Sequence, residues 1–135
     1  MHEWALAEAV IYSVSGFAKK KEMKKVREIE IVLGEMQNID KDIFRLAIND
    51  ISKMQGSLFS VFRVKIRSEK TVLKCMACGN EWAFSFKNGI SKDDMEAIHF
   101  IPEVSHVYMK CPKCGSRDFE IVRGRGVRIK SVKGE

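Results

Sequence analysis

The four cysteines of this chain fall into two matched pairs, Cys75-Met-Ala-Cys78-Gly and Cys111-Pro-Lys-Cys114-Gly. In such a knuckle the turn brings both sulfurs to one side, and the glycine accepts the positive φ that follows. Two knuckles together supply four thiolates, the tetrahedral donor set that suits Zn²⁺. We therefore predict one zinc ion in a closed site, with no open position for a catalytic water and a role in holding the local fold together.

The spacing of the cysteines also allows other uses. The thiols could form disulfides or two separate dithiols, and iron also suits a tetrahedral set of four sulfurs. Residues 79–110 separate the two knuckles, a longer interval than the commonest ribbon spacing. The repetition of the whole knuckle, glycine included, favours one shared metal ion over two local sulfur pairs.

The first three residues, Met1-His2-Glu3, form a second set of candidate metal ligands. The terminal amine, the next backbone nitrogens and the imidazole of His2 can reach one ion, and a square-planar nitrogen set suits Ni(II) or Cu(II). Each backbone amide must lose its proton to bind, so the affinity should rise with pH. The residues alone also allow His2 to be an ordinary exposed side chain.

The elements that must position these groups follow from the periodicity of the apolar residues. Helical spacing predicts helices over residues 3–18 and 41–54, and Asp40 stands at the N-cap position of the second helix. Alternating apolar and polar residues predict extended segments over residues 26–33, 58–67 and 119–130.

The order of these elements predicts an α+β fold in which the cysteine module is an insertion. Residues 1–70 offer two helices and two strands, a thin sheet with exposed edges. A returning C-terminal strand would cover one edge, so we expect residues 1–70 plus 120–135 to form a small α/β sandwich-like domain. Residues 71–119 would form the inserted zinc-ribbon-like module. Within that module we expect a short strand and a helical turn, which are marked by Trp82, Phe84 and Phe86 and by Ser91.

Composition and charge indicate which classes of protein this chain can belong to. Hydrophobic residues make up 45% of the chain and charged residues 31%, which is typical of a globular rather than a disordered protein. The most apolar stretch, residues 9–18, is too short and too interrupted to span a membrane. The start of the sequence lacks the basic segment of a secretory signal, so we expect a cytoplasmic protein. The net charge of +6 permits an acidic partner but does not require a nucleic acid.

Taken together, these features resemble the HypA family, the nickel metallochaperones of NiFe hydrogenase maturation. The conjunction of the two knuckles with Met-His-Glu at the start makes the resemblance specific, and it covers nearly the whole chain. The segments that carry it are both knuckles, Met1-His2-Glu3, Trp4-Ala5-Leu6-Ala7, Ile29–Glu35, Cys111–Ser116 and Gly124–Val127.

The resemblance implies that the N-terminal domain binds Ni(II) through the terminal amine, backbone nitrogens and a histidine side chain. In this sequence Met1, His2 and Glu3 would supply the nickel site, with His2 as the side-chain ligand and Glu3 contributing chiefly its backbone nitrogen. The cysteine site would hold zinc, through Cys75, Cys78, Cys111 and Cys114. The family delivers nickel together with the GTPase HypB into the large subunit of hydrogenase, and some members also serve urease.

Residues 98–106 resemble the archaeal type of the family, in which a histidine of the zinc module adds a nickel ligand. His99 is the better candidate for that role in this sequence. The alternative is that His99 and His106 lie half-exposed beside the knuckles and only form hydrogen bonds.

Three other functional classes compete with nickel delivery. An enzyme would need a catalytic set, a phosphate loop or an open metal site, and the sequence contains none of these motifs. A structural adaptor would leave His2 without a role. A zinc ribbon that binds nucleic acid could use two basic clusters, Lys19–Arg27 and the set Arg123, Arg125, Arg128, Lys130 and Lys133. We interpret the chain as a nickel-delivery protein, not an enzyme, whose partners are a HypB-type GTPase and the hydrogenase large subunit rather than a membrane or a nucleic acid.

Overall fold

The computed structural model describes residues 2–84, 93, 97 and 109–135, which group into two compact units. Unit 1 consists of Met1–Val32, Ile39–Arg67 and Arg128–Glu135. Unit 2 consists of Leu33–Asn38 and Ser68–Val127. No helix in the described part of the chain has the length and apolar character needed to cross a bilayer.

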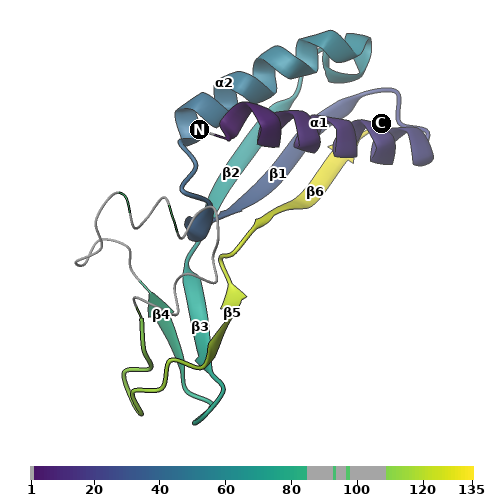
Figure 1. Ribbon diagram of the computed structural model, residues 1–135. Coiled ribbons are helices and arrows are strands. Elements are labelled where there is room, and N and C mark those ends of the chain that lie inside the picture. Colours follow the sequence, from purple (N-terminus) through teal and green to yellow (C-terminus); the bar gives the residue numbers. More distant parts are fainter. Residues whose placement is uncertain (1, 85–92, 94–96, 98–108) are drawn as a thin grey trace. The chain divides into compact units, whose positions relative to one another are not determined.

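Unit 1 combines two helices with a three-stranded sheet (Figure 1). Helices α1 (Glu3–Lys20) and α2 (Lys41–Ser52) pack against each other and cover one face of the sheet. The strand order is β2-β1-β6, with β1 at Val26–Gly34, β2 at Arg63–Glu69 and β6 at Val127–Gly134. The predicted α+β fold is therefore confirmed, and so is the return of the C-terminal segment to the N-terminal sheet.

The core of unit 1 lies between the helices and the sheet. Its largest fully buried side chains include Ile11 of α1, Phe44 and Ile48 of α2, and Ile29 and Ile31 of β1. The two isoleucines of β1 alternate with polar residues, so one face of the strand is apolar and the other is charged. This alternation was predicted from the sequence and holds the strand in register against the helices.

The apolar periodicity of residues 3–18 and 41–54 predicts buried stripes that include Phe17 and Ile43, and at both positions this prediction is wrong. Phe17 of α1 is 40% exposed and Ile43 of α2 is 42% exposed, whereas Ile11, which the predicted stripe omits, is fully buried. The buried face of α1 is displaced from the predicted one because this helix packs against α2 as well as the sheet. The predicted cap is confirmed, since Asp40 Oδ1 accepts the backbone N–H groups of Asp42 and Ile43 at 2.9 and 3.1 Å.

The strand predicted over residues 58–67 starts too early. Helix α2 runs directly into a 3₁₀ segment, η2 (Lys53–Phe59), in which Gly56 takes a φ of +72°. Phe59 is buried, and its ring meets that of Phe62 edge-on with centroids 5.3 Å apart. These aromatic contacts hold a compact turn, so the chain becomes extended only in β2.

Unit 2 is built on a second sheet with the strand order β4-β3-β5. Strand β3 (Thr71–Cys75) pairs antiparallel with β4 (Glu81–Phe84) on one side and with β5 (Phe119–Arg123) on the other. The rings of Trp82 and Phe119 meet edge-on at 5.7 Å. The small core around them consists of Met36, Leu73, Met109 and Phe119, with Trp82 and Ile121 packed against it.

The predicted strand at Trp82 is present as β4. Periodicity missed β3, because this strand is short and follows β2 after a single residue. The expected positions of Phe86 and of the helical turn at Ser91 lie outside the described residues.

The boundaries of the compact units differ from the expected ranges, 1–70 plus 120–135 and 71–119. Strand β5 belongs to unit 2 because it pairs with β3, and unit 1 resumes only at Arg128. Leu33–Asn38, which includes the short 3₁₀ turn η1, also belongs to unit 2. These boundaries follow from which strands pair with each other, and not from the order of the strands in the sequence.

Three glycines of unit 2 lie in backbone contact. Gly34 N–H donates to the carbonyl of Gly126 at 2.8 Å, and Met36 N–H donates to that of Gly124 at 3.1 Å. A Cβ atom on Gly34 would overlap the backbone of both other glycines. Gly124 has a φ of +81° and lies against the backbone of Thr71. The segment Gly124–Gly126 therefore lies in backbone contact with Gly34. This contact leaves no room for a side chain on Gly34, and the backbone of Thr71 leaves none on Gly124.

Replacing Gly34 by alanine should destabilise the protein by on the order of 3 kcal/mol, because the added methyl group would have to displace backbone. Gly16→Ala is the matched control. Gly16 lies within α1 with nothing within 4 Å of its Cβ position, so this change should stabilise by roughly 0.5–1 kcal/mol. Urea unfolding measures both effects, and equal stabilities of the two variants would contradict the glycine contact.

Candidate metal centre

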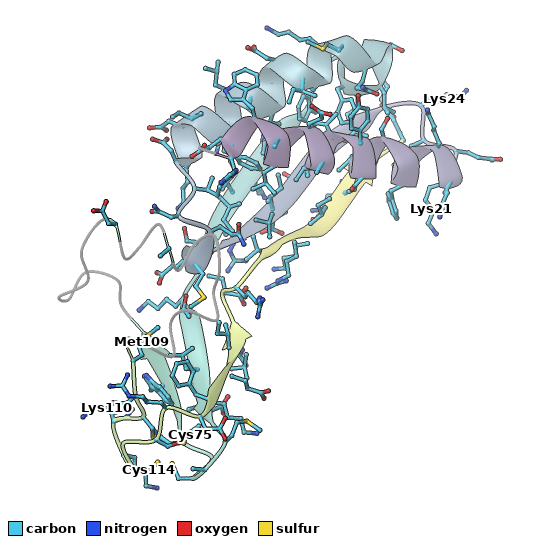
Figure 2. The ribbon with its side chains drawn as sticks, viewed as in Figure 1. Lys21, Lys24, Cys75, Met109, Lys110 and Cys114 are labelled. Atoms are coloured by element: carbon cyan, nitrogen blue, oxygen red, sulfur yellow. The ribbon has the colours of Figure 1, made fainter. Side chains whose placement is uncertain are left out.

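The four cysteine sulfurs converge in unit 2, where all four lie within 4.8 Å of one another. The first knuckle begins at the last residue of β3, and Cys75 is paired in register with Phe119 of β5. This pairing brings together two chain segments that are far apart in the sequence, and Cys75 and Cys114 lie close together in Figure 2. Cys75 and Cys111 are buried, while Cys78 and Cys114 are exposed.

The spacing of the sulfurs fits a tetrahedral metal ion. Cys75 Sγ lies 3.5 Å from Cys114 Sγ, and Cys78 Sγ lies 3.6 Å from Cys111 Sγ. An ion bound about 2.3 Å from each thiolate would set its ligands about 3.8 Å apart. All four cysteines are free, since a disulfide would need a sulfur separation of about 2.05 Å. The arrangement therefore fits one shared ion better than it fits local sulfur pairs.

The thiols of the cluster do not ionise equally. A hydrogen bond from Cys78 N–H at 3.4 Å outweighs the effect of burial and lowers the pKa of Cys75. Burial opposes ionisation of Cys111, but backbone N–H groups of its own knuckle outweigh it and lower that pKa to about 6. A backbone N–H also favours the Cys114 thiolate, yet the neighbouring Cys75 and burial raise its pKa to about 12. Without a cation the four thiols therefore resist ionising together, and a divalent ion at the centre would compensate this repulsion.

The two knuckles differ in the hydrogen bonds made by the residue that follows each knuckle glycine, Asn80 in the first and Ser116 in the second. Cys75 N–H donates to the carbonyl of Asn80, and Cys111 N–H donates to that of Ser116, each at 2.8 Å. The side-chain amide of Asn80 also donates to Cys111 Sγ at 3.8 Å and so links the first knuckle to a sulfur of the second. The equivalent Ser116 hydroxyl instead accepts Asp118 N–H at 3.0 Å. The sequence analysis did not identify Asn80 as a residue of the site. Its position directly after the glycine of the first knuckle is the one indication that the sequence gives.

Asn80→Asp should weaken the hold on a bound zinc ion. The change keeps the side-chain shape but removes the donor and sets a carboxylate near the Cys111 thiolate, so we expect roughly tenfold faster transfer of zinc to a chelator. Ser116→Ala is the control, because it removes a side chain at the equivalent place that bonds to Asp118. A chelator time course compares the two, and equal rates would exclude a role for the Asn80 amide.

The N-terminal residues lie at the start of α1 in unit 1. His2 is exposed and occupies the N-cap position, where its carbonyl accepts Leu6 N–H at 2.9 Å. Glu3 is only 4% exposed, and its carboxylate accepts Asp40 N–H at 3.1 Å. Burial raises the pKa of Glu3, but hydrogen bonds, including the one from Asp40, lower it by more. Glu3 thus anchors the start of α1 to the start of α2.

The structure brings the four cysteines together and assigns His2 and Glu3 to the other unit. Met1, His99 and His106 lie outside the described residues, so their expected roles stay predictions. The anchoring contact of the Glu3 carboxylate was not predicted, because its partner Asp40 is distant in the sequence.

Comparison with known proteins identifies the family. A family described as hydrogenase/urease nickel incorporation, metallochaperone, HypA, matches residues 1–134. The hydrogenase maturation factor HypA of Pyrococcus horikoshii is 43% identical over 136 aligned residues, which cover 100% of this chain and 96% of that protein. The protein of the same name from Ignicoccus hospitalis is 31% identical and aligns with 92% of this chain and 89% of its own.

Solved structures share the fold. The solution structure of the Ni metallochaperone HypA from Helicobacter pylori is 22% identical, covers 99% of this chain and 97% of that chain, and superposes with a TM-score of 0.65. The family match includes the N-terminal Met-His-Glu and both cysteine knuckles, the features on which the resemblance was based. This chain therefore belongs to the HypA family of metallochaperones for nickel incorporation into hydrogenase and urease.

Proposed function

We propose that this protein binds Ni(II) at its N-terminus and delivers it for insertion into the large subunit of NiFe hydrogenase. Membership of a nickel metallochaperone family is the observation that carries the proposal. The position of His2, exposed directly in front of α1, supports it. Nickel is a cargo here, so its site must keep the ion during transit and release it to the acceptor.

The proposed nickel ligands are the α-amine of Met1, the backbone nitrogens of His2 and Glu3, and the His2 imidazole. The first N–H groups of an α-helix have no intrahelical acceptor, so their use as ligands need not unwind α1. The Glu3 carboxylate is already engaged with Asp40 and therefore serves to hold the helix start in place. Loading and release then require only Met1, His2 and the first residue of the helix to rearrange.

Zinc is the ion proposed for the four-cysteine cluster, where its role is structural. The donor set and the sulfur separations of 3.5 and 3.6 Å support this assignment. Four thiolates complete a tetrahedral shell and leave no position for a reacting water. The ion would join the end of β3 to the segment before β5 and so complete a unit whose own core is small.

The proposed partners are a HypB-type GTPase, which takes part in nickel loading, and the hydrogenase large subunit, which receives the ion. The process is a ligand exchange in the cytoplasm and not an enzymatic reaction of this chain. Partner binding would reorganise the N-terminus, with His99 as a candidate additional nickel ligand during transfer. Service to urease is a further option within the family description.

A nickel titration tests the proposal. Protein that starts at Met1 should take up one Ni(II) per chain, with the visible absorption of a square-planar nitrogen site. The same protein with a Gly-Ser extension before Met1 should bind much more weakly, because the amine is moved away while His2 is kept. Equal binding by both forms would contradict the terminal-amine ligand, and no nickel uptake by either would overturn the proposed function.

A further inference from the structure

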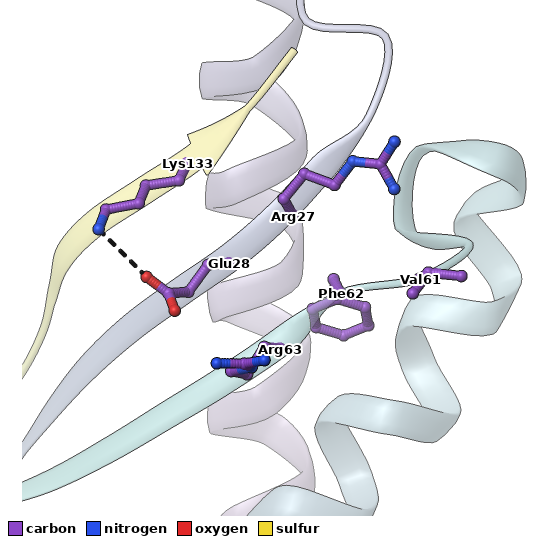
Figure 3. Close-up of a pocket in the computed structure, with 6 residues that line it drawn as sticks. All are labelled: Arg27, Glu28, Val61, Phe62, Arg63 and Lys133. Atoms are coloured by element: carbon purple, nitrogen blue, oxygen red, sulfur yellow. Dashed lines mark ion pairs between the residues drawn. The ribbon is translucent and has the colours of Figure 1, made fainter.

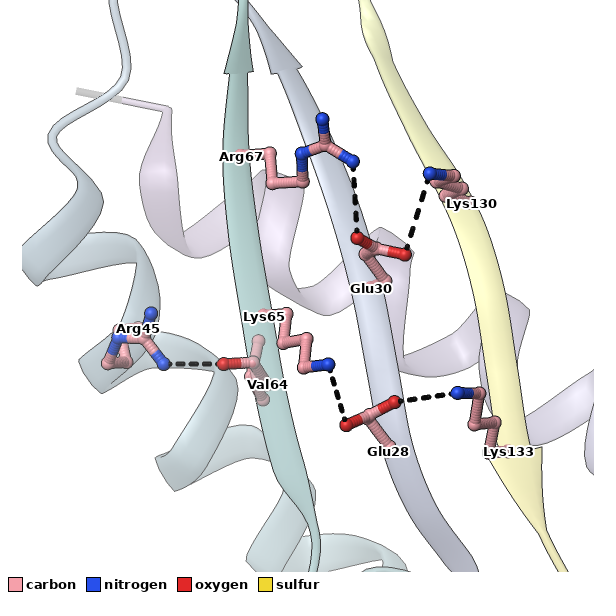
Figure 4. A network of polar contacts seen from close by, with 8 residues as sticks. All are labelled: Glu28, Glu30, Arg45, Val64, Lys65, Arg67, Lys130 and Lys133. Carbon is pink, nitrogen blue, oxygen red and sulfur yellow. Dashed lines mark hydrogen bonds and ion pairs between the residues drawn. The ribbon is translucent and has the colours of Figure 1, made fainter.

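The face of the unit 1 sheet that the helices leave uncovered carries an ordered set of charges (Figure 4). On the central strand β1, two carboxylates each lie between a cation from β2 and a cation from β6. The pairs are Glu28 with Lys65 and Lys133, both at 3.4 Å, and Glu30 with Arg67 at 3.5 Å and Lys130 at 3.9 Å. We call Lys65, Arg67, Lys130 and Lys133 the cation array.

The carboxylates lie beneath the cations of this array. The side chains of Glu28 and Glu30 are 15% and 19% exposed, whereas those of the array are 48–68% exposed. Solvent therefore meets ammonium and guanidinium groups, and four cations against two carboxylates leave a net charge of +2. Exposed ion pairs contribute little to folding stability, so stability alone does not account for this arrangement.

A pocket of about 470 Å³ is lined by Lys133 of the array and by Glu28, the carboxylate paired with it (Figure 3). Arg27 and Arg63 add two more cations, and Arg27 is ion-paired with Glu135. The remaining lining residues are the apolar Val61 and Phe62, and Val61 is 72% exposed. Cationic groups and an exposed apolar side chain thus occur together at this place.

We propose that the cation array and the adjoining pocket dock an acidic segment of a partner protein that carries a large apolar side chain. The partner's carboxylates would pair with the array, and its apolar side chain would lie against Val61 and Phe62. Because Glu28 and Glu30 already hold the cations, these long side chains lose less conformational freedom on binding. This docking surface is separate from the proposed nickel site. It rests on the proposed function in one respect: a protein that delivers nickel must bind a protein that receives it.

The geometry favours a protein segment over a nucleic acid. The two rows of the array, on β2 and β6, are separated by two strand spacings, or about 10 Å, which is the width of one helix or one extended segment with its side chains. Between the rows run the two carboxylates, which would repel a continuous line of phosphates. A protein segment can instead place individual carboxylates over the cations and an apolar residue over the pocket.

The test measures binding of a fluorescent peptide with spaced glutamates and one phenylalanine, by anisotropy at low and physiological salt. The array variant is Lys65→Gln with Lys130→Gln. Glu28 keeps its ion pair with Lys133 and Glu30 keeps its ion pair with Arg67, so neither carboxylate of the sheet is left without a cation. The control is Lys20→Gln with Lys41→Gln, two exposed helix positions with the same change in net charge. Single-stranded oligothymidylate of equal charge is the competing probe.

The array variant should bind the peptide at least roughly fivefold more weakly, and the control should change the affinity less than twofold. Replacing the peptide phenylalanine by alanine should also weaken binding to the wild-type protein. Equal losses in both variants, tighter binding of the oligonucleotide, or no peptide binding at low salt would each overturn the proposal. All measurements are made without nickel, so their outcome is independent of the N-terminal metal site.

Discussion

A protein in which His2 is replaced by alanine is expected to lose tight Ni(II) binding, with the Kd rising at least about a hundredfold, or ~2.7 kcal/mol. The amine and two backbone nitrogens would remain, but a square-planar set needs a fourth donor, which the imidazole supplies in the proposed site. The His2 side chain makes no capping hydrogen bond to α1, so its removal should leave the helix intact. Calorimetric titration with nickel measures the effect.

Two further measurements make this result specific. Zinc content and the unfolding transition should match those of the wild type, because the cysteine cluster belongs to the other unit. Glu3→Gln is the contrasting variant: it keeps every backbone nitrogen and should bind nickel nearly normally, while the weakened contact with Asp40 N–H should lower stability. Unchanged nickel affinity in the His2 variant would refute the ligand assignment.

Replacing Cys75 by alanine should release zinc and unfold unit 2. The change removes a buried thiolate that lies 3.5 Å from Cys114 Sγ and also ends β3, so both the ion and the strand lose an anchor. The binding energy of a structural zinc ion is folding energy, of the order of 10 kcal/mol in small zinc domains. The core of unit 2 is too small to replace that contribution. Metal analysis should find almost no zinc.

Amide hydrogen exchange distinguishes local unfolding from global failure of the Cys75 variant. Amides of β3, β4 and β5 should exchange fast, whereas those of α1 and α2 should keep their protection, because the core of unit 1 contains none of the cysteines. Met76→Ala, beside Cys75 and 54% exposed, is the matched control and should retain zinc and protection. Retained zinc with a protected β3 in the cysteine variant would show that the cluster is not the structural metal site.

Zinc binding should also depend on pH with a definite sign. Without an ion the pKa is about 6 for Cys111 and about 12 for Cys114, so at neutral pH at least one thiol is still protonated. The ion binds thiolates and must displace these protons, and its affinity therefore falls as the pH falls. Calorimetry in buffers of different ionisation enthalpy counts the released protons, and no release at neutral pH would contradict this coupling.

The sequence was informative where function depends on local spacing. Each knuckle places two sulfurs and a glycine within five residues, so the pairing of donors could be recognised without a fold. The Asp40 cap and the alternation along β1 are local in the same way, and both are present. The predicted burial of Phe17 was wrong because the burial of a helix residue depends on where the other elements pack.

Other features depend on contacts between distant residues and had no local signal. Strand β5 joins β3 instead of the N-terminal sheet, and the boundary of unit 2 follows from that pairing. The Asn80 contact with Cys111 and the Glu3 contact with Asp40 each join residues more than thirty positions apart.

By itself the sequence determined the grouping of the four cysteines, the family and the α+β class, because these rest on residue types at short, regular intervals. Only the tertiary structure decided which strands pair, which side chains steady the cluster and the helix start, and how glutamates and cations are layered on the open face of the sheet. Such arrangements arise when strands from distant parts of the chain lie side by side, and no short interval in the sequence encodes which ones will meet.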